Sequence, residues 1–365
     1  MAEFVLPGPH FPLLGALWPG DRNTLSPLDP YGTPEERDEV KEVLRELSVL
    51  DRNGAIDARL HRVLSVLDDP ERSVSIDMMT SAEMRSLDTY YGTDKISAVS
   101  LVTAGSGTVQ VREDNGLDHF FSPADFDGPF NTDLTPADIA MNQTEAWIAA
   151  AVFDGERRSA FDAVTQVVNR NGLVLEPQVH DSSSIQRIFA FSAQKPGENF
   201  FLDLLDGMGG INRTDTDPAG IERHLQSLQA KGIIQKTGSG YTITDRMLPM
   251  IRRTLISDRM TLIRTGRIDS AGRKISESAQ YIRADGSLLW FIAADTNPDR
   301  IFLKYLSAEH EKTIFTNILD NTAYSLSGMT VPIHTAHPSE KHFCSQCGSR
   351  IGAGKKFCSV CGVKI

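Results

Sequence analysis

Residues 278–292 read SAQYIRADGSLLWFI, in which two strand-forming runs flank Asp285 and Gly286. An Asp-Gly pair between such runs is typical of a tight β-hairpin, so this stretch predicts two antiparallel strands. Residues 97–111, SAVSLVTAGSGTVQV, can be laid over it and predict a second hairpin that turns at glycine. The identical pairs are Ser97 with Ser278, Ala98 with Ala279, Gly105 with Gly286, and Ser106 with Ser287. The match indicates an internal repeat, with chance similarity as the alternative.

A second pair of segments extends this repeat. Residues 44–67, LRELSVLDRNGAIDARLHRVLSVL, can be laid over residues 225–255 if the second copy has the longer turn. Each copy predicts a helix, a connection that contains glycine, and another helix. The fold class expected is therefore α+β, with two possibly duplicated halves that pack about a pseudo-twofold axis and share a core. This order of elements, taken twice, resembles the duplicated halves of type VII secretion chaperones.

The expected organisation follows from these repeats and from the composition of the termini. It consists of an N-terminal arm at 1–34, a first α+β half at 35–155, a connecting helix or strand region at 156–189, a second half at 190–327, a linker at 328–341 and a zinc ribbon at 342–365.

The second half contains a helix with clear start and stop signals. Asp217 before Pro218 predicts the helix start, and the pair Lys231-Gly232 predicts its end. An alternating segment that turns at residues 238–240 follows, so helix and hairpin together resemble the later part of a winged helix. Such a helix either packs against protein or reads DNA. Its exposed face is mixed rather than basic, which favours protein packing. The DNA alternative relies on the basic segment 246–283 and on possible contacts from Arg223, Lys231, Lys236, Arg252 and Arg253.

All four cysteines lie in the last two dozen residues, in the stretch FCSQCGSRIGAGKKFCSVCG at 343–362. Cys344, Cys347, Cys358 and Cys361 form two C-x2-C pairs, a spacing that places four thiolates around one tetrahedral zinc ion. Two disulfides or four metal-free thiols are the alternatives. The segment resembles the zinc-ribbon tails of bacterial and archaeal proteins, which carry the FCxxCG knuckle twice. That resemblance implies one structural zinc and a module that binds other macromolecules, and it departs from the type VII secretion chaperones.

Composition limits the remaining possibilities. The chain has 365 residues, of which 40% are hydrophobic, enough for a sizeable core. We find no apolar run of about 18 residues and no basic leader, so we expect a cytoplasmic protein without membrane insertion. Residues 1–150 carry 26 acidic and 11 basic side chains, a net charge of -15, which leaves +4 for the rest. The acidic half should repel nucleic acid, whereas the other half need not.

Catalytic motifs are missing from the sequence. We find no H-E-x-x-H, no G-x-S-x-G and no complete phosphate-binding loop. Four thiolates would close the coordination shell of zinc and leave no open position for chemistry. The sequence therefore predicts a non-enzymatic adaptor or chaperone-like protein that binds a protein partner. The alternative is a transcription-related DNA-binding protein that uses the helix at 217–231.

Overall fold

The computed structural model divides the chain into two units, Met1–Thr330 and Val331–Ile365. All residues that the structure describes lie in the first unit. They are residues 3–18, 22–28, 33–47, 50–51, 53, 55–93, 97–104, 107–127, 130, 135–167, 177–195, 197–208, 217–294, 296–297, 299–321 and 323–329.

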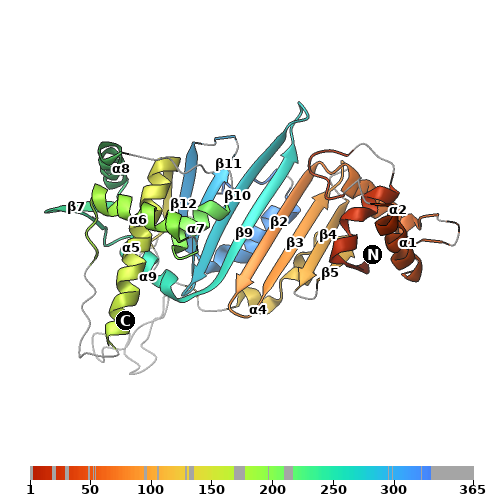
Figure 1. The fold of residues 1–365 in the computed structure, drawn as a ribbon, viewed down its shortest axis with the longest axis horizontal. Helices are drawn as coiled ribbons and strands as arrows, with labels where there is room; N and C mark the ends of the chain where they lie inside the picture. The colour runs from red at the N-terminus through yellow and green to blue at the C-terminus, as the bar shows by residue number, and fades with distance from the viewer. Residues whose placement is uncertain are drawn as a thin grey trace, which may run out of the picture. The chain divides into compact units, whose positions relative to one another are not determined.

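One large antiparallel sheet dominates the described part of the chain (Figure 1). Its ten strands are β1 (Glu3–Pro7), β2 (Arg72–Thr80), β3 (Met84–Tyr91), β4 (Ala98–Ala104), β5 (Thr108–Arg112), β6 (Ala137–Asn142), β9 (Ser257–Ile268), β10 (Lys274–Ala284), β11 (Ser287–Ala294) and β12 (Arg300–Ser307). They are ordered β1-β5-β4-β3-β2-β9-β10-β11-β12-β6. Two four-stranded meanders, β2 to β5 and β9 to β12, thus meet at β2 and β9. The strand that precedes the helices of each half, β1 or β6, forms the outer edge.

Helices precede each meander, and shorter ones follow it. They are α1 (Pro34–Glu46), α2 (Ala58–Asp68), α3 (Leu117–Phe120), α4 (Pro123–Phe126), α5 (Gln143–Val167), α6 (Ser182–Gln194), α7 (Phe200–Gly207), α8 (Pro218–Ala230), α9 (Leu248–Arg253) and α10 (Glu311–Asp320), with the short 3-10 helices η1 (Gly8–His10), η2 (Pro12–Leu17), η3 (Thr254–Ile256) and η4 (Ala308–His310). A separate hairpin, β7 (Ile234–Thr237) with β8 (Gly240–Ile243), follows α8. No helix among the described residues is both long and apolar enough to span a membrane.

Local signals place several of these elements where the sequence predicts them. Strands β10 and β11 pair up to Ala284 and Ser287, and Asp285 and Gly286 between them both have positive φ. Such a two-residue turn matches the twist of the flanking strands. The Asp217 side chain accepts a hydrogen bond from Gly220 N at 2.6 Å and starts α8. The mixed α+β class, the hairpin at 278–292 and the start of this helix are confirmed. The winged-helix likeness remains a prediction.

The strand order differs from the correspondence that the sequence match predicts. The sequence match lays β4 over β10, but β4 is the third strand of its meander and β10 is only the second. Counted outward from the centre of the sheet, β4 corresponds to β11. Hairpins that turn at glycine have similar local sequences, so a sequence alignment can pair two hairpins that differ by one strand in their position in the meander. The expected boundary at residue 155 also falls inside α5.

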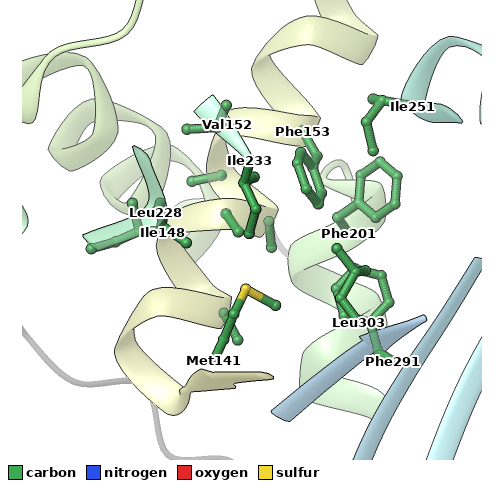
Figure 2. Close-up of a cluster of buried hydrophobic side chains, with 14 of the residues drawn as sticks. Met141, Ile148, Val152, Phe153, Phe201, Leu228, Ile233, Ile251, Phe291 and Leu303 are labelled. Atoms are coloured by element: carbon green, nitrogen blue, oxygen red, sulfur yellow. The ribbon is translucent and has the colours of Figure 1, made fainter. Parts of the chain in front are cut away.

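Two of the hydrophobic clusters among the described residues hold helices against the sheet. In the larger core, α5 packs on α7, α8 and α9 and on β11 and β12 (Figure 2). Ring centroids of Phe153 and Phe201 lie 5.4 Å apart, and Phe291 of the sheet lies 6.1 Å from Phe201. The smaller core joins η2, α1 and α2 to β1, β4 and β5, and it includes Leu6 and Leu14 from the expected N-terminal arm. Each buried aromatic or aliphatic side chain contributes about 1.5 to 3 kcal/mol through the hydrophobic effect.

Candidate protein-binding face

The two faces of the central strands differ sharply in burial. In β2, Val74, Ile76 and Met78 are buried, whereas the alternating Ser73, Ser75 and Asp77 are partly exposed. Strand β9 repeats the pattern, with Ile263 buried and the next residue, Arg264, exposed. Because neighbouring side chains on a strand point to opposite faces, one face of this region is closed and the other is open.

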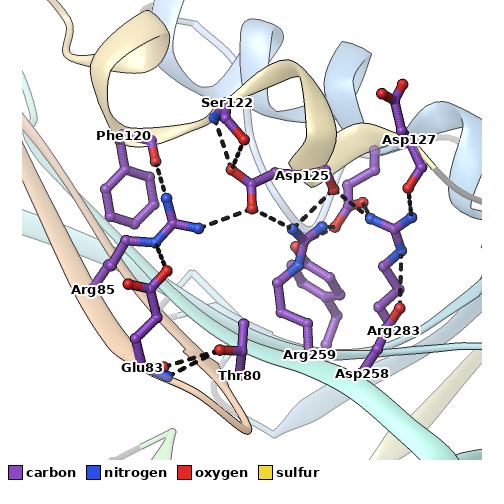
Figure 3. A network of polar contacts seen from close by, with 12 residues as sticks. Thr80, Glu83, Arg85, Phe120, Ser122, Asp125, Asp127, Asp258, Arg259 and Arg283 are labelled. Carbon is purple, nitrogen blue, oxygen red and sulfur yellow. Dashed lines mark hydrogen bonds and ion pairs between the residues drawn. The ribbon is translucent and has the colours of Figure 1, made fainter.

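A buried polar network lies on the closed face (Figure 3). Arg85 of β3 donates to Phe120 O at 2.7 Å and to the Asp125 carboxylate at 2.9 Å. Arg259 of β9 donates to Asp125 O at 3.0 Å and pairs with Glu311 of α10. Arg283 of β10 also contacts Asp125 O and Glu311. Three arginines from three strands therefore hold the segment around α4 and the start of α10 against this face.

The other end of α10 is fixed as well. Arg72 of β2 donates to Ile318 O, and the Tyr91 hydroxyl of β3 donates to Leu319 O. Carbonyl groups at a helix C-terminus attract a positive charge, while Glu311 places a negative charge in the first turn. Helix α10 is thus held at both ends, and the closed face offers no room for a partner.

Helices flank the open face on both sides. Val99 and Leu101 lie on the same face of the sheet as Ser73, and the core that contains α1 and α2 covers them. Phe291 and Leu303 share that face further along the sheet and lie under α5 and α7. Figure 1 shows the resulting gap, in which β3, β2 and β9 run between the two groups of helices.

A row of methionines crosses one end of the open face. Met79 of β2 lies opposite Met84 of β3 on one side and opposite Met260 of β9 on the other. Met84 is 60% exposed and Met79 is 47% exposed. Met260 in turn lies opposite Ile282, which belongs to the larger core. The row therefore extends the buried core into a strip of flexible apolar side chains, a composition common at adaptable binding surfaces.

The rest of the open face is polar. Arg264 donates to Asp77 at 3.0 Å, and the Ser86 hydroxyl donates to the same carboxylate at 2.7 Å. Asp88 accepts a hydrogen bond from Ser75, and burial raises the pKa of Asp88 above its usual range. A cavity of about 430 Å³ opens here, lined by Thr24, Leu25, Ser73, Ser75, Asp88, Tyr90, Met208, Arg264, Ser276 and Ser278, among others.

The predicted basic contacts are not among the residues of the open face described above. The four cysteines are outside the described residues. Lys231 pairs with the buried Glu145, and Arg252 pairs with the buried Glu156 at 2.8 Å. Arg253 donates to the Tyr305 hydroxyl at 2.9 Å and contacts Asp285 at 3.3 Å.

The other two predicted contacts are exposed. Arg223 lies on the outer face of α8, and Lys236 on β7 lies 5.9 Å from the ring of Tyr241. The basic segment 246–283 also contributes Arg259 and Arg283 to the closed face. The structure thus shows no continuous basic surface formed by these residues, and the DNA alternative remains a prediction without a supporting contact.

The sequence analysis missed the open face, although one signal was present. In residues 72–80, RSVSIDMMT, small polar or acidic residues alternate with apolar ones, which is typical of a strand with one exposed face. Nothing in that segment indicates that β9 would lie beside it. Comparison of the chain with protein-family models gives no match, and comparison with curated proteins gives none either.

Proposed function

We propose that this protein is a non-enzymatic adaptor or chaperone-like protein that binds a protein partner across the open face of its central sheet. The observation that carries the proposal is the strip of β3, β2 and β9 between two groups of helices, with the exposed methionine row at one end. Leu25 packs over Gly266 beside Ser73, so the strip runs from Ser75 to Met79, about 13 Å long, and it is about 14 Å wide from β3 to β10. These dimensions suit one secondary-structure element of a partner.

The arrangement of the sheet supports a duplicated origin. Each half consists of an edge strand, a set of helices and a four-stranded meander, and the two meanders meet in the middle. We propose that the halves are related by duplication, as the similarity to type VII secretion chaperones implies. The shared sheet then creates a central surface that neither half has alone.

The tail adds a second proposed element. Four thiolates at the spacing of Cys344, Cys347, Cys358 and Cys361 suit a single structural zinc. Resemblance to zinc-ribbon tails supports a role in binding a macromolecule, and the closed shell of four sulfurs supports the absence of catalysis. We propose that the tail strengthens the interaction with the partner or recruits another protein.

Affinity purification from the native host tests the proposal. We expect the unaltered protein to enrich one partner, and the variant with Met79→Glu and Met84→Glu to lose it, because two charges would be buried at the contact. The matched control carries Leu47→Glu and Phe161→Glu, which also replace exposed apolar side chains but lie away from the open face. A form that ends at Thr330 measures the contribution of the tail. Equal enrichment by both double variants would refute binding at the open face.

A further inference from the structure

Asp88 occupies the middle of the open face and makes no salt bridge among the described residues. It lies on β3, opposite Ser75 of β2, and lines the 430 Å³ cavity. Among the described residues, no salt bridge joins Asp88 to an arginine, lysine or histidine. Lys274 lines the same cavity but makes no ion pair with Asp88, and Arg264 is engaged by Asp77 at 3.0 Å. The Asp88 carboxylate is held in a partly buried site, where a hydrogen bond from Ser75 and the nearby charge of Arg264 support its negative charge, but it has no salt bridge of its own.

Another hydrogen-bond acceptor on the open face, Gln280, has no donor among the described residues. The Oε1 atom of Gln280 in β10 is buried and has no hydrogen-bond partner among the described residues, and only 9% of this residue is exposed. Gln280 lies opposite Leu262 of β9, which in turn lies opposite Asp77, so it belongs to the open face. A buried acceptor without a donor destabilises the fold. Gln280 is not among the residues that line the cavity around Asp88, so the Asp88 carboxylate is the acceptor that the cavity offers to a positively charged donor.

We infer that the cavity around Asp88 is a subsite for a lysine or arginine side chain of the bound protein. The inference rests on the proposed function and specifies the chemistry of the partner. The ammonium or guanidinium group would pair with the Asp88 carboxylate and donate to the hydroxyl oxygens of Ser73 and Ser278, which line the same cavity. The ring of Tyr90, also in the cavity wall, offers an aromatic face for the cation.

The sheet geometry sets the spacing of the partner's side chains. Ser75, opposite Asp88, lies four residues from Met79 along β2, a separation of about 13 Å at 3.3 Å per residue. The expected partner segment therefore presents apolar side chains to the methionine row and a basic side chain about 13 Å away. Apolar contact supplies area, and the buried charge pair selects the partner.

A titration without the partner tests the subsite alone. We would add Nα-acetyl-lysine N-methylamide to the full-length protein with ¹³C-labelled methionine methyl groups, and use the norleucine analogue as the neutral control. The Met208 methyl group reports on the cavity wall, and that of Met84 reports on the distant end of the face. We expect the lysine compound alone to shift the Met208 signal, the Asp88→Asn variant to abolish the shift, and Asp88→Glu to restore it in part. Equal shifts with both compounds, or an unchanged response in Asp88→Asn, would overturn the inference.

The affinity of the captured partner for variants of this protein tests whether the cation is a side chain of that partner. Asp88→Asn should weaken the affinity by roughly tenfold or more, whereas Asp118→Asn, which removes an exposed charge on α3, should leave it unchanged. If the partner binds both variants equally, the inference fails while the proposed function stands. If the lysine compound binds at Asp88 and the partner ignores it, the site serves a free amine and the assignment to a protein side chain is wrong. If no partner is captured, the proposed function loses its support and the titration alone decides the subsite.

Discussion

Arg259 of β9 and Glu311 of α10 form an ion pair in which both side chains are almost completely buried, at 4% and 1% exposure. Glu311 also accepts from the Tyr281 hydroxyl and from Arg283. Substituting Glu311→Gln removes the buried carboxylate that Arg259 and Arg283 share, and leaves them only the longer contacts to Asp125 at 3.8 Å and Asp258 at 3.6 Å. We expect a loss of about 3 to 5 kcal/mol in the free energy of unfolding. Urea unfolding followed by circular dichroism measures the loss.

The matched control for this pair lies on the opposite face of β9. Asp77 and Arg264 lie 3.0 Å apart, and their side chains are 26% and 48% exposed. The same change of carboxylate to amide, Asp77→Asn, should cost less than about 1 kcal/mol because water screens an exposed pair. Equal losses for the two variants would contradict the structural role of the buried pair.

His180 should make the fold sensitive to acid. It is fully buried next to Gly155, where an added Cβ would lie 2.3 Å from the ring, and neither ring nitrogen has a partner among the described residues. Burial lowers the pKa of His180 to about 4, from 6.5 in the unfolded chain. Because the unfolded state binds the proton first, stability should fall as the pH drops from 6.5 to about 4, by up to about 3 kcal/mol.

The His180→Leu variant provides the comparison. Its stability should change less over that pH range, since the leucine carries no titrating group. The difference between the two curves of unfolding free energy against pH isolates the histidine. Parallel curves would show that the ring titrates alike in the folded and unfolded states.

Asp154 should affect the pH dependence of stability in the opposite direction from His180. This buried carboxylate on α5 accepts from Phe201 N at 2.9 Å and Leu202 N at 3.0 Å and so caps α7. Burial raises the pKa of Asp154 to about 6, despite these two hydrogen bonds, which favour the charged form. Its folded pKa exceeds the unfolded value of 3.8, so its contribution to stability should increase as the pH falls from 6 to 3.8 and diminish as the pH rises.

Two substitutions separate the cap from the charge of Asp154. Asp154→Asn keeps a hydrogen-bond acceptor for the start of α7 and removes the contribution of this carboxylate to the pH dependence of stability. Asp154→Ala leaves two backbone N–H groups without a partner and should cost roughly 2 to 4 kcal/mol at pH 7. Thermal unfolding at several pH values checks both expectations, and an alanine variant as stable as the asparagine variant would rule out the capping role.

The tail should bind one zinc ion per chain. Four thiolates in two C-x2-C pairs provide a complete tetrahedral shell, so metal analysis should give about one zinc, and Cys344→Ser with Cys358→Ser should remove it. Residues Met1–Thr330 form a unit of their own. We therefore expect the unfolding of this unit to be unchanged when a chelator removes the zinc. Metal-free protein that keeps all four thiols protected from alkylation would argue for disulfides instead.

Local elements of this protein could be predicted from its sequence because a few neighbouring residues determine them. The turn at Asp285-Gly286 requires positive φ at two adjacent residues, and the helix that starts at Pro218 requires only the cap from Asp217. The same local character explains why the sequence match pairs hairpin β4-β5 with β10-β11, which carry similar turn signals at different positions in their meanders.

The tertiary structure decided which of these residues are free to act. Lys231 and Arg252 looked like candidate contacts, but Glu145 and Glu156, distant in sequence, neutralise them inside the fold. The open face exists because β2 lies beside β9 and α10 covers only one side of the pair, and residues more than 180 positions apart have to meet to create it. Turns and caps are short-range effects, whereas burial and charge pairing depend on which distant segments come together, so the sequence by itself determined the elements and the fold determined the candidate site.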